Sequence, residues 1–280
     1  MGIDQLIENN ACRLYRADIL SALHKDLLEE LDWLNTISLK HLKNYQIWSF
    51  SPPPLPPAPP SVPKLTNSRH HRQTIVSHLP TLPTSELPFL ARMFAKDAKN
   101  YHVWSYRQWL VRHFSLWDTE LPYIETLLLE DVRNNSAWNH RWFVVFARYT
   151  DPTKHSIKNN DADAEVPDEV VEREIRYAQG KIRLAPQNQS PWNYLRGVLR
   201  RGGRGEGGMK AFAEEFADLD REDGVRSSHA LDFLADVYKE GDRERAGRAL
   251  ELLARRYDPI RKNSWNWRRG ELGLVEVGAT

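Results

Sequence analysis

The sequence predicts an all-α fold, a single array of antiparallel helix hairpins, and three observations lead to this prediction. Tryptophan is abundant, with ten copies in 280 residues. Several of these tryptophans stand in the pattern Asn-x-x-x-Trp-x-x-Arg, which recurs with a period of about 34 residues. Segments with apolar side chains at helical spacing precede the pattern. A fixed period of this length is typical of repeat proteins, in which each hairpin buries its apolar face only against its neighbours.

The tryptophan motif recurs in copies of differing completeness. Two copies are intact, and their tryptophans stand 34 residues apart. A third copy has Leu195 in place of Arg, and a late copy has Arg261 in place of Asn. The last two motif tryptophans are 73 residues apart, about two periods, which predicts one copy between them that has lost its signature. The residues assigned to this structural motif are Trp48, Arg72, Trp104, Arg107, Asn134, Trp138, Arg141, Asn188, Trp192, Trp265 and Arg268.

Each motif is predicted to open the second helix of a hairpin. Its Asn is expected at the N-cap, where the side-chain oxygen accepts a hydrogen bond from a free backbone N–H. Trp and Arg then follow on one helical face, so that Trp is expected to be buried and Arg to reach an adjacent turn or carboxylate. Packing is the simplest role for each of these residues. The apolar segments before the motifs are Leu90, Met93 and Phe94, then Leu121, Ile124, Leu128 and Val132, then Val171, Ile175, Ala178 and Ile182.

The composition excludes several classes of function. Thirty-nine basic and 38 acidic residues give a formal charge of +1, so no global basic field favours nucleic acid as a partner. A single cysteine excludes a disulfide framework and a thiolate-rich zinc site, and it is typical of a reducing compartment. No apolar run approaches the roughly 18 residues that a membrane span needs. We therefore expect a cytoplasmic protein without a membrane span.

Four segments carry a resemblance to a known family. Lys43-Asn-Tyr-Gln-Ile-Trp48 and Lys99-Asn-Tyr-His-Val-Trp104 resemble the α subunits of heterodimeric protein prenyltransferases. Asp131-Val-Arg-Asn-Asn-Ser-Ala-Trp138 and Asp258-Pro-Ile-Arg-Lys262 resemble, within that family, the α subunit shared by farnesyltransferase and geranylgeranyltransferase type I. Tetratricopeptide repeats share the period, but their small residues at fixed positions are not evident here.

The resemblance implies a right-handed α-α superhelix that wraps a separate β subunit. It implies transfer of a farnesyl or geranylgeranyl group from an isoprenoid diphosphate to the cysteine of a C-terminal C-a-a-X motif. It also implies that the β subunit holds a zinc ion and that magnesium accompanies the diphosphate. No metal-ligand spacing such as H-x-x-E-H or C-x-x-C occurs in this sequence, so we expect no metal site in the chain. The alternative function is a non-catalytic helical-repeat scaffold, like tetratricopeptide proteins, that binds peptides or proteins.

The resemblance also implies a set of site residues on the hairpin turns. Departure of a diphosphate needs cationic and hydroxyl donors where negative charge develops. Lys43 and Tyr101 take this catalytic role by resemblance, and Lys-Asn-Tyr at successive turns is expected to place donors on one edge of the array. The substrate-binding residues that the resemblance implies are Lys43, Asn44, Tyr45, Gln46, Asn100, Tyr101 and His102.

The chain departs from the family pattern in several places. A proline-rich tract at residues 49–69 separates Trp48 from the expected His-His-Arg, and its removal restores the motif. One interpretation is a ligand for SH3 or WW domains. We prefer a retained intron of 63 nucleotides, a hypothesis that cDNA sequencing tests. A repeat is also missing ahead of Tyr15, which indicates a truncated gene model or a wrong start codon. Residues 151–168 are expected to form a solvated loop within one repeat domain of residues 1–280.

Overall fold

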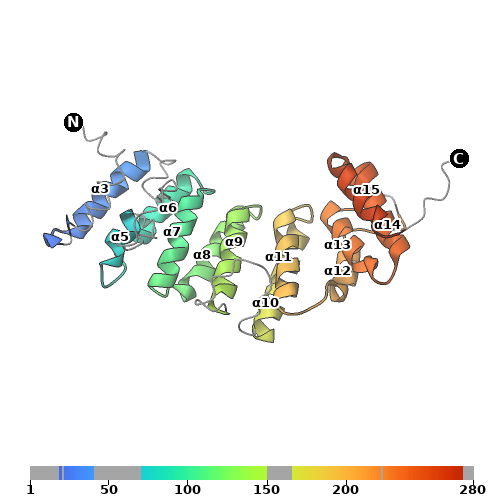
Figure 1. Ribbon diagram of the computed structural model, residues 1–280, viewed down its shortest axis with the longest axis horizontal. Coiled ribbons are helices and arrows are strands. Elements are labelled where there is room, and N and C mark those ends of the chain that lie inside the picture. Colours follow the sequence, from blue (N-terminus) through green and yellow to red (C-terminus); the bar gives the residue numbers. More distant parts are fainter. Residues whose placement is uncertain (1–18, 21, 41–70, 150–165, 222, 274–280) are drawn as a thin grey trace, which may run out of the picture. The chain divides into compact units, whose positions relative to one another are not determined.

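The computed structural model describes residues 19, 20, 22–40, 71–149, 166–221 and 223–273 (Figure 1). Two predicted features lie outside these residues. One is the proline-rich tract at 49–69, and the other is most of the predicted loop at 151–168, whose last residue, Asp168, begins a helix. The site and motif predictions that fall outside the described residues are Lys43, Asn44, Tyr45, Gln46 and Trp48.

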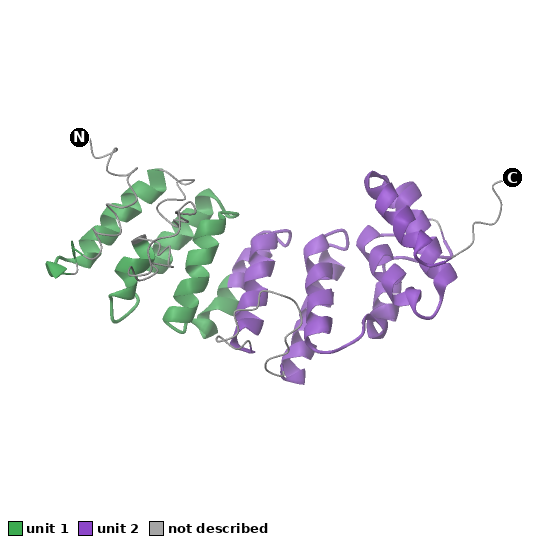
Figure 2. Ribbon diagram, viewed as in Figure 1, with its two compact units in different colours: residues 1–123 green, residues 124–280 purple. Residues whose placement is uncertain are grey.

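The described chain is helical and divides into two compact units, residues 1–123 and residues 124–280 (Figure 2). Its β structure is limited to one isolated bridge between Ala217 and Val225. The prediction that residues 1–280 form one domain stays a prediction. The helices of the first unit are α3 (Leu27–Lys40), α5 (His71–Ser77), α6 (Glu86–Lys96) and α7 (Tyr101–His113), and α8 (Trp117–Glu130) crosses the boundary.

The second unit continues the alternation of paired helices. Its α-helices are α9 (Asn135–Phe146), α10 (Asp168–Leu184), α11 (Gln189–Arg201), α12 (Lys210–Glu214), α13 (Ser228–Lys239), α14 (Arg243–Leu252) and α15 (Lys262–Gly270). Four shorter segments are the 3-10 turns η1 (Ala147–Tyr149), η2 (Glu206–Met209) and η4 (Pro259–Arg261), and the π-helical η3 (Leu253–Tyr257).

The motif tryptophans among the described residues are buried as predicted, and each is also hydrogen bonded. The indole N–H of Trp104 donates to the carbonyl of Ala98 at 2.9 Å, six residues earlier in the turn. Trp138 and Trp192 make the same bond at the same distance to the carbonyls six residues before them. A buried Trp needs a partner for its N–H, and this bond supplies it while fixing the turn against the second helix. The predicted spacing therefore reflects both core packing and turn geometry.

The copy that lost its signature is the hairpin of α12 and α13. Ser227 takes the place of Asn at the N-cap of α13, and its hydroxyl accepts from the N–H of Ala230 at 3.2 Å. Leu231 stands at the Trp position and is buried. Ser227 also donates to the carbonyl of Pro186 at 2.5 Å, much as Asn188 donates to the carbonyl of Val132 at 2.8 Å. The turn is thus preserved where the motif is not.

The glycine-rich segment 202–208 packs closely against α10 where α11 ends. Gly202 ends α11, and a Cβ built on it would lie 2.7 Å from a methyl carbon of Val171. Gly203 has a φ of 65°, in the left-handed region that favours glycine. The segment then enters η2. Close packing and a positive φ, rather than flexibility, account for its first two glycines.

Buried ion pairs join each of the first hairpins to the next. The guanidinium of Arg72 donates from Nη2 and Nε to the two carboxylate oxygens of Glu86, at 2.6 and 3.2 Å. The same two-point contact joins Arg107 to Glu120 and Arg141 to Glu174. All of these side chains are buried. The motif Arg is therefore a connector between repeats.

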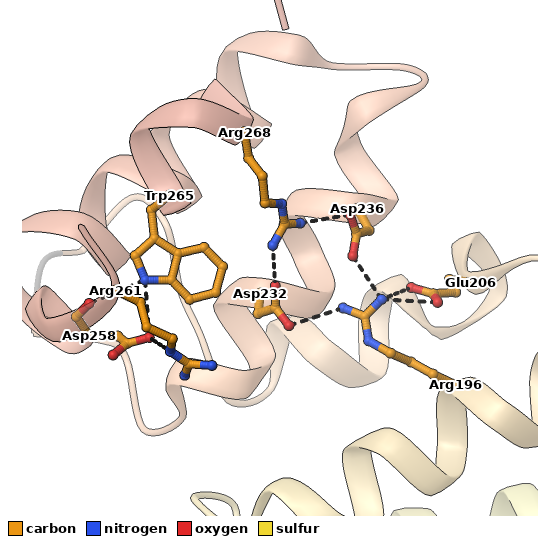
Figure 3. A network of polar contacts seen from close by, with 8 residues as sticks. All are labelled: Arg196, Glu206, Asp232, Asp236, Asp258, Arg261, Trp265 and Arg268. Carbon is orange, nitrogen blue, oxygen red and sulfur yellow. Dashed lines mark hydrogen bonds and ion pairs between the residues drawn. The ribbon is translucent and has the colours of Figure 1, made fainter. Parts of the chain in front are cut away.

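The later hairpins are joined by a different network, shown in Figure 3. Leu195 and Leu234 stand where the connecting Arg would be, and both are buried. Arg268 of α15 donates instead to Asp232 at 2.6 Å and to Asp236 at 2.8 Å, both on α13. From the other side, Arg196 of α11 donates to Asp236 at 2.8 Å. A partly exposed network thus connects α11, α13 and α15.

Candidate functional site

The turn between α6 and α7 holds the three predicted site residues that the structure describes. Asn100 caps α7 as predicted, since its side-chain oxygen accepts from the N–H groups of His102 at 3.1 Å and Val103 at 3.4 Å. Helix α6 ends at Lys96, so Lys99 lies in the turn rather than in the preceding helix. Asn100 is buried, whereas Tyr101 exposes 74% of its surface. The capped turn therefore presents Tyr101 to solvent from a fixed backbone.

The chemistry of this turn combines a hydroxyl donor, a neutral imidazole and an ammonium group. The rings of Tyr101 and His102 meet edge to face, with centroids 5.6 Å apart. Burial lowers the pKa of His102 below its usual value of 6.5, so this side chain is neutral at pH 7. Lys99 is exposed, and its ammonium has no ion-pair partner within the described ranges. The turn can thus offer a phenolic O–H and a positive charge to an anion.

Two other turns repeat this backbone with different side chains. Asn134 accepts from the N–H groups of Ser136 and Ala137, and Asn188 accepts from that of Ser190. Neither turn carries a tyrosine after its Asn: the first has Asn135 there, and the second has Gln189. The turn before α7 is therefore distinguished by its side chains and not by its backbone.

The comparison with curated proteins decides the family. The α subunit of Candida albicans protein farnesyltransferase/geranylgeranyltransferase type-1 is 35% identical over 285 residues, which cover 98% of this chain and 81% of the relative. The chain belongs to the protein prenyltransferase α-subunit family. The corresponding subunit of Dictyostelium discoideum is 31% identical over 111 residues, covering 36% of this chain and 32% of the relative.

The family's repeats coincide with the hairpins of the structure. The model described as the protein prenyltransferase alpha subunit repeat matches residues 83–114, 117–148 and 171–202, which are the hairpins α6–α7, α8–α9 and α10–α11. Among solved structures, Candida albicans protein geranylgeranyltransferase-I complexed with GGPP matches with a TM-score of 0.77 and 33% identity. That match covers 97% of this chain and 81% of the solved chain. The predicted fold class, the all-α superhelix of prenyltransferase α-subunit repeats, is confirmed.

The structure brings only part of the predicted site together. Asn100, Tyr101 and His102 share one turn, whereas Lys43, Asn44, Tyr45 and Gln46 lie outside the described residues. Their roles in a prenyltransferase α subunit therefore stay predictions. The described motif residues beyond that turn are N-caps, buried tryptophans or members of the ion pairs that connect hairpins. Their assignment to packing stays a prediction.

Metal-binding clusters and membrane-spanning helices are both absent from the described part of the chain. No group of three His, Cys, Asp or Glu side chains there converges as a metal site would require. No helix in the same residues has both the length and the apolar character needed to cross a bilayer.

The motif of Asn, Trp and Arg does not include the glutamates that pair with its Arg, so these glutamates were not predicted from the sequence. Glu86 and Glu120 each begin the run Glu-Leu-Pro followed by an aromatic residue, and they stand 34 residues apart. Glu174 also has an aromatic residue three positions later. In each case the guanidinium of the paired Arg lies over that aromatic ring, at 3.4 to 3.9 Å from its centroid. A search for Glu-x-x-aromatic at the same period would have found the connectors.

Proposed function

We propose that this chain is the α subunit of a heterodimeric protein prenyltransferase of the farnesyltransferase/geranylgeranyltransferase type I class. The complex transfers a farnesyl or geranylgeranyl group from the isoprenoid diphosphate to the cysteine of C-terminal C-a-a-X motifs. The similarity over nearly the whole chain to the α subunit shared by these enzymes carries this proposal. Activity requires a β subunit, and the complex acts in the cytoplasm.

The reaction exchanges a carbon–oxygen bond for a carbon–sulfur bond. The cysteine thiolate attacks the first carbon of the allylic diphosphate, the C–S bond forms, and the diphosphate leaves with the electron pair of the broken C–O bond. Zinc held by the β subunit would lower the pKa of the substrate thiol and so favour its thiolate form, and magnesium bound with the diphosphate would offset its charge. The α subunit contributes donors where negative charge grows on the departing group.

The described turn supports the part of the proposal that concerns the α subunit. The hydroxyl of Tyr101 and the ammonium of Lys43 both donate hydrogen bonds to the diphosphate. The high exposure of Tyr101 on a capped turn favours this role. Tyr45, Gln46 and His102 surround the isoprenoid and the C-terminal end of the peptide substrate, and the lowered pKa of His102 keeps it uncharged next to an apolar chain. Asn44 and Asn100 shape the two turns.

Co-expression with a β subunit tests the proposal. The purified pair is assayed for prenyl transfer to a C-a-a-X peptide with farnesyl and with geranylgeranyl diphosphate. A prenyltransferase assembles and turns over, whereas a peptide-binding scaffold shows neither association nor turnover. Lys43→Ala is expected to lower the rate of the chemical step while the heterodimer still assembles. Loss of assembly as its main defect would instead make Lys43 a structural residue.

The proline-rich tract calls for a parallel measurement. A variant that lacks residues 49–69 rejoins Trp48 to His70, His71 and Arg72. Under the retained-intron interpretation, this shortened chain is the better partner of the β subunit and the more active one. Sequencing cDNA across the junction is the direct test, and transcripts that uniformly keep all 63 nucleotides would refute the interpretation.

A further inference from the structure

Besides the Asn100 cap and the Trp104 indole, the side chain of Asp97 holds the turn that presents Tyr101. Its carboxylate accepts a hydrogen bond from the backbone N–H of Lys99 at 3.1 Å. Its own N–H donates to the carbonyl of Met93 at 3.0 Å, and its carbonyl accepts from the N–H of Asn100 at 3.2 Å. Asp97 therefore ties the end of α6, the middle of the turn and the N-cap of α7 to one another.

A second turn has the same construction without the proposed site. Asp131 accepts from the N–H of Arg133 at 2.9 Å through its side chain and from that of Asn134 at 3.0 Å through its carbonyl. Its N–H donates to the carbonyl of Leu127 at 2.9 Å. The residue after Asn134 is Asn135, not a tyrosine. This turn is a control within the same chain for what the Asp contributes to folding alone.

A third turn shows that the carboxylate is not needed to form this backbone. Ala185 takes the place of Asp, with φ −143° and ψ 77°, against −150° and 87° at Asp97. Its N–H and carbonyl make the same two backbone bonds, at 3.1 and 2.9 Å. The next residue is Pro186, whose ring fixes its own φ and restricts Ala185 to extended conformations. The same turn is thus held by a carboxylate in two repeats and by a proline in a third.

We infer that Asp97 is a positioning residue for the proposed prenyl transfer. It holds the turn in the conformation in which the hydroxyl of Tyr101 meets the departing diphosphate. The carboxylate acts through the backbone, since it is bonded to an N–H of its own turn. Holding a donor in place before the reaction contributes to the rate because small displacements of reacting groups are costly. The inference rests on the proposed function.

Four variants of the heterodimer separate positioning from folding. Asp97→Ala removes the carboxylate, and Asp131→Ala removes its counterpart in the control turn. The double variant Asp97→Ala with Ala98→Pro copies the third turn, and the N–H of Ala98 that it removes has no partner in the described residues. Asp97→Asn keeps an acceptor oxygen and removes the charge.

The measurements are kcat, the KM for the isoprenoid diphosphate and the thermal midpoint of each heterodimer. Asp97→Ala is expected to lower kcat about tenfold with an unchanged midpoint. Asp131→Ala should leave kcat unchanged, and both the proline double variant and Asp97→Asn should recover most of the rate. An unchanged kcat in Asp97→Ala, or an equal loss in Asp131→Ala, would overturn the inference.

Hydrogen exchange provides a readout that does not depend on turnover. Amides of residues 97–103 in the heterodimer are expected to exchange faster in Asp97→Ala than in wild type and to regain protection in the proline double variant. Unchanged protection in Asp97→Ala would contradict the inference by itself. A wild-type heterodimer without prenyl transfer would contradict the proposed function, whatever the exchange shows, so the two failures are distinguishable.

Discussion

The connections between early hairpins and those between late hairpins use the same charges in different surroundings. Arg72 and Glu86 have no exposed surface, and their contact is a two-point fork of parallel hydrogen bonds. In the late network Arg268 and its partners Asp232 and Asp236 are between a quarter and two fifths exposed. Water competes for the hydrogen bonds of the exposed late network but does not reach the buried pair of Arg72 and Glu86. The early connections should therefore be rigid and costly to break, and the late ones adjustable.

The largest expected effect is loss of a buried connector. Glu174 accepts from Arg141 and also from Tyr194, at 2.7 Å, and all three side chains are buried. Glu174→Ala leaves the Arg141 charge buried without a carboxylate, which costs about 3–5 kcal/mol. Hydrogen exchange of α10 and α11 measures this loss locally. A cost no larger than that of Asp236→Ala would remove the distinction between the two kinds of connection.

The next prediction concerns the close approach of α9 and α11 near the ion pair of Arg141 and Glu174. A Cβ built on Gly197 of α11 would lie 2.9 Å from the Trp142 ring. Gly197→Ala therefore forces the ring or the helix to move, at a cost of about 1–3 kcal/mol in the free energy of unfolding.

Gly180 of α10 provides the matched control for this overpacking. A Cβ there meets nothing within 4 Å, so Gly180→Ala should stabilise by up to about 1 kcal/mol through helix propensity. Chemical denaturation of both variants gives the two values. Equal effects of the same sign would contradict tight packing around Gly197.

A smaller effect is expected in the late network, and it should depend on salt. Arg268→Ala removes the contacts with Asp232 and Asp236, which are partly exposed and contribute about 1 kcal/mol or less. Because salt screens exposed charges, raising the ionic strength should speed hydrogen exchange in α13–α15 of the wild type and lessen the effect of the substitution. Exchange around Arg141 should change little, since its partner is buried.

The smallest effect concerns two carboxylates, Glu174 and Glu206, whose pKa values are shifted in opposite directions. Burial alone would raise the pKa of Glu174, but the charge of Arg141 and hydrogen bonds from Arg141, Tyr194 and Arg173 outweigh it and lower the pKa below 4.5. Stability from this group is present above pH 4.5 and is lost as the pH falls through its folded pKa.

Glu206 behaves in the opposite way. Burial raises its pKa above 4.5 despite the nearby Arg196. Its carboxylate therefore opposes folding at neutral pH, and that penalty shrinks as the pH falls toward 4.5. Glu206→Gln should be more stable than wild type at pH 7, with an advantage that decreases on acidification. Denaturation curves across this pH range measure it, and a constant difference would contradict the raised pKa.

Much of the fold could be predicted because its signals are local. Asn at the N-cap bonds to N–H groups two and three residues later, and the Trp indole bonds six residues back. Both interactions lie within one hairpin, so their spacing is visible in the sequence. The site was predicted by resemblance rather than by such a signal. Only Asn100, Tyr101 and His102 of it fall among the described residues.

The sequence by itself determined the all-α class, the period and the identity of the capped turns, because each depends on neighbours within one repeat. The tertiary structure decided which carboxylate each Arg meets. It paired Arg141 with Glu174 across 33 residues, and it joined Arg268 to Asp232 and Asp236 across 36 and 32. Those pairings form only when the helices pack, since the charges are apart along the chain and meet on adjoining helices.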